Sequence, residues 1–156
     1  MAKVILYYAH PGNKFAQANR MMQRAAKGVT GITQVDLYAE YPRHDISIET
    51  EQQRLLEHEV IIFQFPIFWY SGPSLVKEWI DLTLEHGFAY GAGGDKLAGK
   101  WLMLAVTAAG PEDAYTAEGY QHYPLRPFLT PYELAARLSK MRFAAPHAHY
   151  SSLKSD

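Results

Sequence analysis

Three short segments of almost uninterrupted apolar residues, at 4–9, 60–65 and 102–107, constrain the fold of this chain more than any other feature. Each has the length of a β-strand, and each is followed within a few residues by proline or glycine. A strand that is apolar on both faces must be buried on both faces, which is typical of a parallel sheet covered by helices. The sequence therefore predicts an α/β protein built on a parallel sheet.

Segments with helical spacing alternate with these strands. The expected helices are 15–26, a helix capped by Ser47 that runs to about 57, one that starts at Pro73, and 131–138; the further strands are 32–37 and 143–150. Such alternation implies right-handed crossovers. The natural five-stranded solution is a flavodoxin-like three-layer αβα sandwich with strand order 2-1-3-4-5. A chain of 156 residues suits one such domain, residues 1–156.

Composition excludes several classes of function. The net charge is −1 and no cluster of basic residues occurs, so a nucleic-acid partner is not expected. The absence of cysteine excludes disulfides and thiol catalysis, and it fits a reducing compartment. No apolar stretch approaches the roughly 20 residues of a spanning helix. His147 and His149 share a strand face without a carboxylate beside them, so no metal site is expected. We therefore expect a cytoplasmic protein that reaches the inner membrane only through a partner.

Ligands of open parallel sheets bind outside the carboxyl ends of the strands, which directs attention to the loops after residues 9, 65 and 107. The first loop leads into a helix, whose N-terminal N–H groups suit one phosphate. His10, Gln17 and Asn19 add neutral donors there, and neither G-x-G-x-x-G nor a Walker motif is present. The alternative is an ordinary strand-to-helix turn with polar side chains.

The other two loops suit a planar ligand. Phe68, Trp69 and Tyr70 are three consecutive aromatic residues on a loop expected at the surface, where they could stack on a ring system. The alternative is a small satellite core or a dimer contact. The loop at 107–113 is made of small residues that let the backbone approach a ligand, although a plain small-residue turn has the same composition.

Several motifs together resemble the flavodoxin-like NAD(P)H:quinone oxidoreductases over residues 3 to about 146. They are Ala9-His10-Pro11, the segment from Gln64 to Pro73, and Leu75-Val76-Lys77-Glu78-Trp79-Ile80-Asp81. Gly87-Phe88-Ala89-Tyr90-Gly91, Leu97-Ala98-Gly99-Lys100, Tyr123-Pro124 and the run from Pro131 to Ala136 resemble one branch, the ancillary proteins of glutathione-regulated potassium-efflux systems (KefG/KefF type).

The resemblance implies a flavin site in the three loops. The phosphate would meet His10 and the segment Ala16, Gln17, Ala18 and Asn19; the ring would lie against Ile67, Phe68, Trp69 and Tyr70 and against Thr107, Ala108, Ala109 and Gly110. Catalytic members place a Tyr and a His beyond the third loop, for which Tyr115 and His122 are the candidates. Ala16 replaces the family's usual Ser, and Ala108-Ala109 replaces Thr-Gly. The family also continues beyond residue 156 into a last helix, so one sheet face is expected to be uncovered.

We expect from these features an enzyme that passes two electrons from NAD(P)H to a quinone through bound flavin. FMN is preferred over FAD because the first loop offers a single phosphate cradle. The alternative is a non-catalytic regulatory subunit that binds the cytosolic domain of a potassium-efflux transporter, with weak or no flavin binding. A homodimer is expected in either case, because edge strands and an uncovered face require burial.

Overall fold

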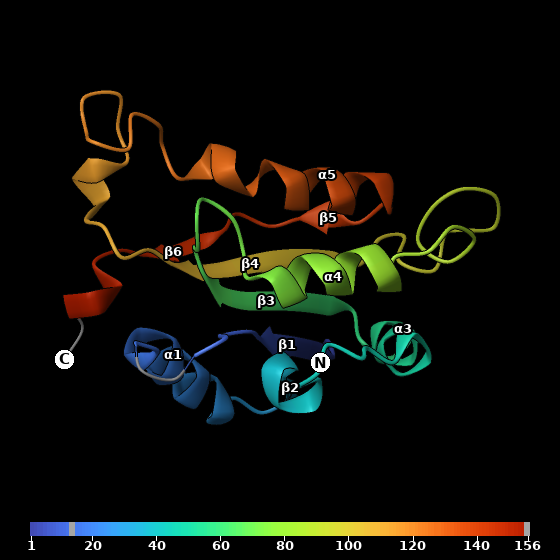
Figure 1. Cartoon of the computed structure of the whole chain (residues 1–156). Helices are drawn as coiled ribbons and strands as arrows, with labels where there is room; N and C mark the ends of the chain where they lie inside the picture. Colours follow the sequence, from blue (N-terminus) through green and yellow to red (C-terminus); the bar gives the residue numbers. More distant parts are fainter. Residues whose placement is uncertain (13–14, 155–156) are drawn as a thin grey trace.

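A computed structural model describes residues 1–12 and 15–154; Asn13, Lys14, Ser155 and Asp156 lie outside the described residues. It shows a parallel sheet with the expected strand order β2-β1-β3-β4-β5, and helices on both sides (Figure 1). The strands are β1 Val4–Tyr8, β2 Ile32–Asp36, β3 Val60–Pro66, β4 Trp101–Thr107, β5 Arg142–Phe143 and β6 His147–His149. The helices are α1 Gln17–Lys27, α2 Leu37–Glu40, α3 Ile48–Glu57, α4 Ser74–Thr83 and α5 Thr130–Leu138, with short 3₁₀ turns at Glu112–Ala114, Arg126–Leu129 and Ser152–Lys154.

The fifth strand of the predicted sheet is divided in two. β5 pairs with the start of β4, and β6 pairs with its end, from Ala105 to Thr107. Pro146 lies directly before β6 and has no N–H to donate to a ladder, which explains the interruption. Both pieces run parallel to β4, so the flavodoxin-like topology is kept.

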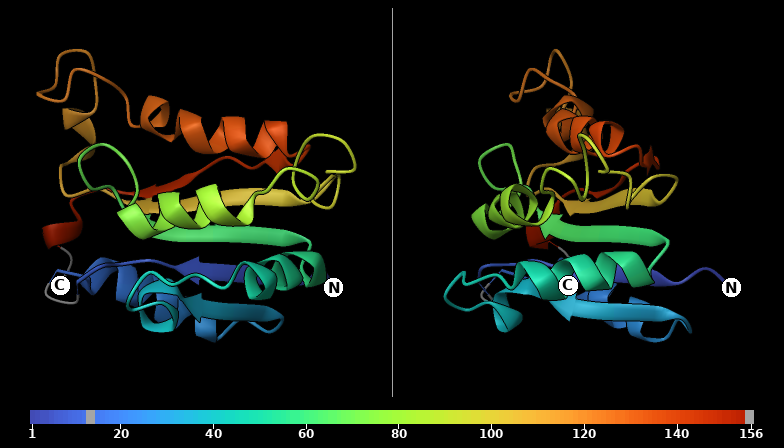
Figure 2. Two further views of the ribbon diagram at one scale, coloured as in Figure 1. Left: turned by 45° about the vertical axis from the view of Figure 1, so that its right-hand side comes forward. Right: turned by 90° about the vertical axis from the view of Figure 1, so that its right-hand side faces the viewer.

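One face of the sheet carries the main core. Tyr7 of β1, Phe63 of β3 and Trp79 of α4 pack ring against ring, with centroids about 5 Å apart. On this face α4 lies over β3 and β4, α5 lies against β5, and α3 contacts α4 (Figure 2). α3 begins where predicted, because the Ser47 hydroxyl accepts a hydrogen bond from the N–H of Thr50.

The opposite face is covered by α1 toward the carboxyl ends of the strands. Gln64 lies between two residues that face α4, so its side chain points to the other side and contacts Asn19 of α1. Farther along this face Trp101 is 39% exposed, and the guanidinium of Arg142 lies 5.4 Å above the centre of its ring. In the described part of the chain, no helix is both long and apolar enough to cross a membrane.

Candidate functional site

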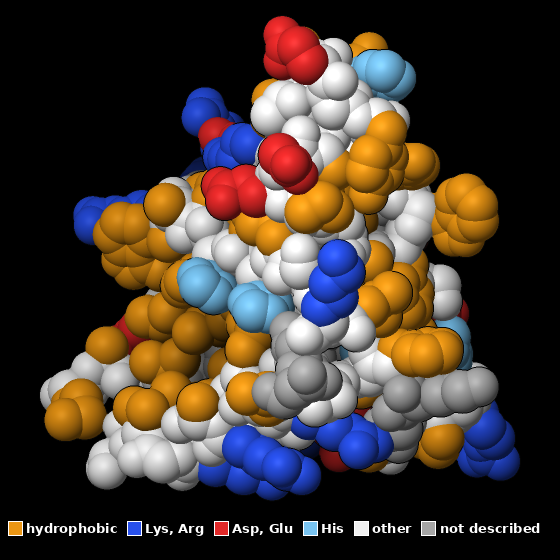
Figure 3. Space-filling view, turned by 90° about the vertical axis from the view of Figure 1, so that its left-hand side faces the viewer, with side chains coloured by type: hydrophobic (Ala, Val, Ile, Leu, Met, Phe, Trp, Pro, Cys, Tyr) orange, Lys and Arg blue, Asp and Glu red, His pale blue; other side chains and the backbone are white. Residues whose placement is uncertain are grey.

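The loops that follow β1, β3 and β4 meet at the carboxyl edge of the sheet and enclose a cleft of about 520 Å³. This size lies within the roughly 300–1,000 Å³ of small-molecule sites. Figure 3 looks onto this edge of the molecule, where hydrophobic side chains gather at the surface. The described residues that line the cleft are His10, Pro11, Gly12, Phe15, Pro66, Ile67, Phe68, Thr107, Ala109, Ser152 and Leu153.

His10 stands at the start of the cleft and is nearly buried. Its Nδ1 accepts a hydrogen bond from the N–H of Gly12, at 3.2 Å, and its ring meets the Phe68 ring edge-on at 5.7 Å. Burial lowers the pKa of His10, and the positive charge of Arg20 lowers it further. The imidazole is therefore neutral at pH 7, and because Nδ1 accepts from Gly12 its proton is on Nε2.

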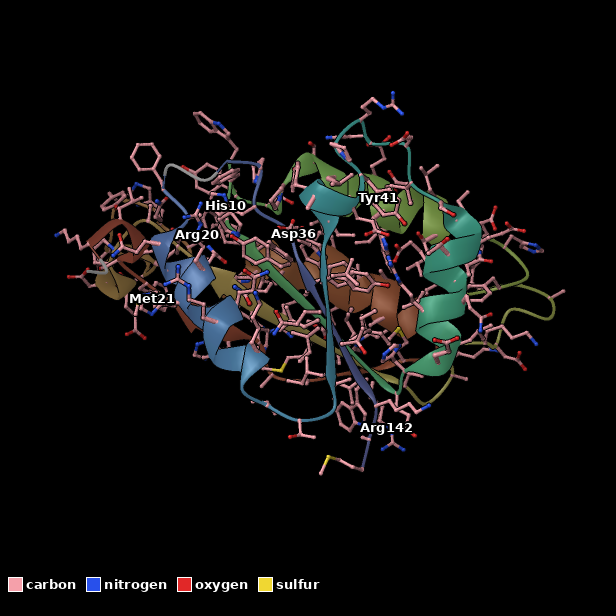
Figure 4. The ribbon with its side chains drawn as sticks, turned by 90° about the horizontal axis from the view of Figure 1, so that it is seen from below. His10, Arg20, Met21, Asp36, Tyr41 and Arg142 are labelled. Carbon is pink, nitrogen blue, oxygen red and sulfur yellow. The ribbon has the colours of Figure 1, made fainter. Side chains whose placement is uncertain are left out.

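Arg20 is a residue that sequence reasoning missed. It lies in the first turns of α1, near His10 in Figure 4 and far from Arg142 at the other end of the sheet. A cation at this position adds to the attraction of an anion toward the first loop. The only hint in the sequence is its spacing of one helical turn from Ala16.

The N-terminus of α1 borders the first loop without a side-chain cap. Ala16 is the N-cap residue, makes no capping hydrogen bond and is 1% exposed, and the first turn contains no acidic residue. The first N–H groups of a helix have no partner within the helix. An alanine at this position leaves them to an external acceptor, where a serine would occupy one of them itself. Gln17 is exposed and Ala18 is buried.

The side chain of Asn19 points into the protein and donates to another residue rather than facing the cleft. It is 2% exposed, and its Nδ2 donates to Oγ1 of Thr107 at 2.6 Å. Nε2 of Gln64 donates to the Asn19 backbone oxygen, also at 2.6 Å. The side chain therefore connects α1 to the ends of β3 and β4 beneath the cleft.

The second loop is a tight two-residue hairpin. The backbones of Phe68 and Ser71 exchange two hydrogen bonds, of 2.8 and 3.1 Å, around Trp69 and Tyr70. Both central residues have positive φ, 47° and 68°, a conformation that side-chain-bearing residues adopt at a cost. Ile67 and Phe68 line the cleft, whereas Trp69 is 93% exposed and Tyr70 packs against Phe128.

The third loop brings Thr107 and Ala109 to the cleft, while Ala108 is buried. A Cβ at Gly110 would lie 2.6 Å from the hydroxyl of Tyr120, so a larger residue there would make this exposed ring move. The chain after β6 crosses this loop and is bonded to it, with Ser152 N–H donating to the oxygen of Ala108. This crossing places Ser152 and Leu153 in the cleft, a contribution that no local pattern in the sequence indicates.

Tyr115 and His122 do not line the cleft in the described structure. Tyr115 lies behind the third loop, close to Gly110, and packs on Tyr150 with ring centroids 5.5 Å apart. Burial raises the pKa of its hydroxyl, which keeps it protonated at neutral pH. His122 is exposed on the irregular segment that leads to the turn at Arg126–Leu129, with φ of 61°.

Comparison with known proteins agrees with this architecture. Residues 2–156 match the family model described as having the flavodoxin-like fold. The chain is 46% identical, over 95% of its length and 81% of the relative, to the glutathione-regulated potassium-efflux system ancillary protein KefG of Serratia proteamaculans. General stress protein 14 of Treponema denticola, solved in complex with FMN, superimposes with a TM-score of 0.91 at 32% identity and covers 95% of this chain and 86% of its own. An NADPH-quinone reductase from P. pentosaceus superimposes at 0.86, with 26% identity and coverage of 99% and 88%.

Proposed function

Since the chain belongs to the flavodoxin-like fold family, and within it to the ancillary proteins of glutathione-regulated potassium-efflux systems, we propose that it is an FMN-dependent NAD(P)H:quinone oxidoreductase. The observation that carries the proposal is the cleft between an uncapped helix N-terminus and an apolar loop. A relative of the same fold is described in complex with FMN, and another is described as an NADPH-quinone reductase.

The residues present fit this cofactor. The N–H groups at Ala16, Gln17 and Ala18, with neutral His10 and the positive charge of Arg20 nearby, suit one phosphate. Ile67 and Phe68 suit a flat ring, and Thr107 and Ala109 permit close approach from the other side. When bound, FMN would supply two-electron transfer between the nicotinamide and the quinone. The protein would hold both substrates in turn in the apolar part of the cleft and exclude water from it.

Tyr115 and His122 remain the proposed catalytic pair. Tyr115 would act from behind Gly110 as a protonated donor, consistent with the raised pKa of its hydroxyl. His122 would have to move with its exposed segment to reach the cleft, and substrate binding is the step at which we expect this movement.

The first test of the proposal is flavin binding. Purified protein, after titration with FMN, FAD and riboflavin, should show flavin absorbance and bind FMN most tightly. Oxidation of NADH and NADPH should then depend on added menadione. Phe68→Ala should weaken FMN binding by about 5-fold, since it removes part of the ring wall. Leu134→Ala, on the exposed side of α5, is the matched control. A protein that cannot be reconstituted with FMN would refute the proposal.

A second function is favoured by the position of the catalytic candidates. Because neither Tyr115 nor His122 lines the cleft, the chain could serve as a non-catalytic regulatory subunit of a potassium-efflux transporter, as the name of its KefG relative suggests. Capture by the cytosolic domain of such a transporter, together with FMN binding but no quinone reduction, would favour this function. Rapid quinone turnover with no complex would reject it.

We also propose a cytoplasmic homodimer. Trp101 and Arg142 on the incompletely covered sheet face, and Trp69 at the cleft, are exposed groups of the kind that are enriched at interfaces. Sedimentation equilibrium should give twice the mass of the 156-residue chain, and a stable monomer would contradict the proposal.

A further inference from the structure

Three buried polar side chains form a cluster directly beneath the cleft. Gln64 is 1% exposed, Asn19 is 2% exposed and Thr107 is 1% exposed. They come from β3, α1 and the end of β4, so the cluster joins the three elements that carry the proposed flavin loops. Of the three, Thr107 alone lines the cleft in the described structure.

The direction of the hydrogen bonds in this cluster follows from the backbone oxygen of Asn19, which can only accept. The backbone oxygen of Asn19 receives a bond from Gln64, which must therefore present its NH₂ group, Nε2, to Asn19. The same Nε2 lies 3.4 Å from Oδ1 of Asn19, which fixes the side-chain amide of Asn19 with its oxygen toward Gln64. Its Nδ2 consequently faces Thr107 and donates to Oγ1 at 2.6 Å.

The hydroxyl oxygen of Thr107 is thus an acceptor within the cluster, and its proton is directed elsewhere. No hydrogen bond from this hydroxyl is found among the described residues, and Thr107 borders the cleft. A buried O–H group without an acceptor is costly, because it has lost its bonds to water. A ligand in the cleft can provide the missing acceptor.

We propose that Thr107 donates a hydrogen bond to the ring or ribityl part of the bound flavin, and that Gln64 is a positioning residue that sets this direction through Asn19. The proposal rests on the proposed function and deepens it. The ring or ribityl part is favoured over the phosphate because Thr107 lies next to the apolar wall, where its backbone oxygen accepts from the N–H of Ile67 at 2.8 Å.

Affinity measurements on matched variants test the donor. Thr107→Val removes the hydroxyl at nearly constant shape, and it should weaken both FMN and riboflavin binding by about 3- to 10-fold. Thr107→Ser keeps the hydroxyl and should bind within about 2-fold of wild type. The visible absorption bands of bound flavin should shift in Thr107→Val and not in Thr107→Ser, which a purely structural role would not produce.

A double-mutant cycle tests the positioning role. Gln64→Met lacks the donor, so it frees the Asn19 amide to turn and should weaken FMN binding by about 2- to 5-fold. In Gln64→Met with Thr107→Val the loss should equal that of Thr107→Val alone, because Gln64 acts only through the hydroxyl. Additive losses would overturn the positioning role. If Gln64→Met fails to fold, as judged by its thermal melting, the same cycle is run with Asn19→Ala in its place.

The outcomes separate this proposal from the proposed function. If wild type binds no FMN, the proposed function fails. If wild type binds FMN and Thr107→Val binds it equally well, only the donor proposal fails. A loss confined to FMN, with riboflavin unaffected, would show that the hydroxyl serves the phosphate and would overturn the assignment to the ring or ribityl part.

Discussion

Two buried polar clusters lie on opposite faces of the sheet, and they differ in whether their hydrogen bonds are closed. On the face of α4, the carboxylate of Glu51 is 0% exposed and accepts from the hydroxyl groups of Tyr7 and Tyr41 and from Arg54, at 2.5–2.6 Å. On the face of α1, the bonds from Gln64 through Asn19 end on the hydroxyl of Thr107, a residue that lines the cleft. Both clusters consist of buried polar side chains, so burial and polarity alone do not distinguish a ligand site from a structural cluster.

The Glu51 cluster is complete within the protein. Three charged or hydroxyl donors converge on one carboxylate, and Arg54 continues to Glu40 at the surface, at 2.9 Å. Burial, with the charge of Glu51, raises the pKa of Tyr7, and burial with the hydrogen bond to Glu51 raises the pKa of Tyr41. Both hydroxyls therefore stay protonated and act as fixed donors. These donors are already used by Glu51 and do not await a ligand. The cluster joins β1, α3 and the segment after α2.

The largest effect is expected when the closed cluster is opened. Glu51→Ala leaves Arg54, Tyr7 and Tyr41 without their common acceptor and should lower the free energy of unfolding by about 3 kcal/mol. This loss lies at the lower end of the range for breaking a buried ion pair, because the Arg54 side chain is 24% exposed and can regain hydrogen bonds to water. Urea unfolding measures the loss. FMN affinity of the folded variant should remain that of wild type.

Glu40→Gln is the control for this prediction. It removes the exposed end of the same network, where Glu40 is 41% exposed, and should cost less than about 1 kcal/mol. A large loss of FMN affinity in Glu51→Ala, without a loss of stability, would mean that the Glu51 cluster belongs to the site and would remove the distinction between the two clusters.

The sequence was sufficient to predict the sheet order and the three loops, because continuous apolar strands and short turns are local features. It also led to Ser47 as a helix cap, through its spacing to the acidic first turn. The Glu51 and Gln64 clusters could not be predicted. Their members are up to 44 and 88 residues apart in sequence, and only the packed strands bring them together. Asn19 illustrates the limit, since its residue type indicated a donor but not that it points into the protein.

An intermediate effect is expected at the strained hairpin of the site. Trp69 has φ of 47° and is 93% exposed, so it contributes strain and little burial. Trp69→Asn places a residue that tolerates this conformation and should raise the free energy of unfolding by about 1 kcal/mol. Quinone reduction should fall, chiefly through a higher KM, if the exposed ring contacts substrate. Differential scanning calorimetry and steady-state kinetics test the two effects.

At the hairpin, the question whether a feature serves the fold or the site concerns the backbone conformation of Trp69 rather than buried hydrogen bonds. Leu138→Asn changes another exposed apolar residue, at the end of α5 and outside the cleft lining, and is the control for loss of apolar surface without relief of a positive φ. Greater stability together with unchanged quinone KM in Trp69→Asn would show that the strained ring has no part in substrate binding. Lower stability would show that the hairpin is held by contacts of Trp69 that its exposure does not reveal.

The smallest effect is expected from protonation of His10, and its sign follows from the lowered pKa. Above the ordinary pKa of 6.5 the imidazole is neutral in both folded and unfolded chains, so it adds no pH dependence. As the pH falls below 6.5, the unfolded chain takes up the proton first, and stability is lost until the pH passes the lower, folded pKa.

His10→Gln removes this contribution to the pH dependence of stability. The urea midpoint of this variant should therefore fall less than that of wild type between pH 7.5 and pH 5. Bound FMN should narrow the difference between the two proteins, since a phosphate near His10 favours the protonated ring and raises its folded pKa. An equal fall in both proteins would show that His10 is not held neutral by burial at the cleft.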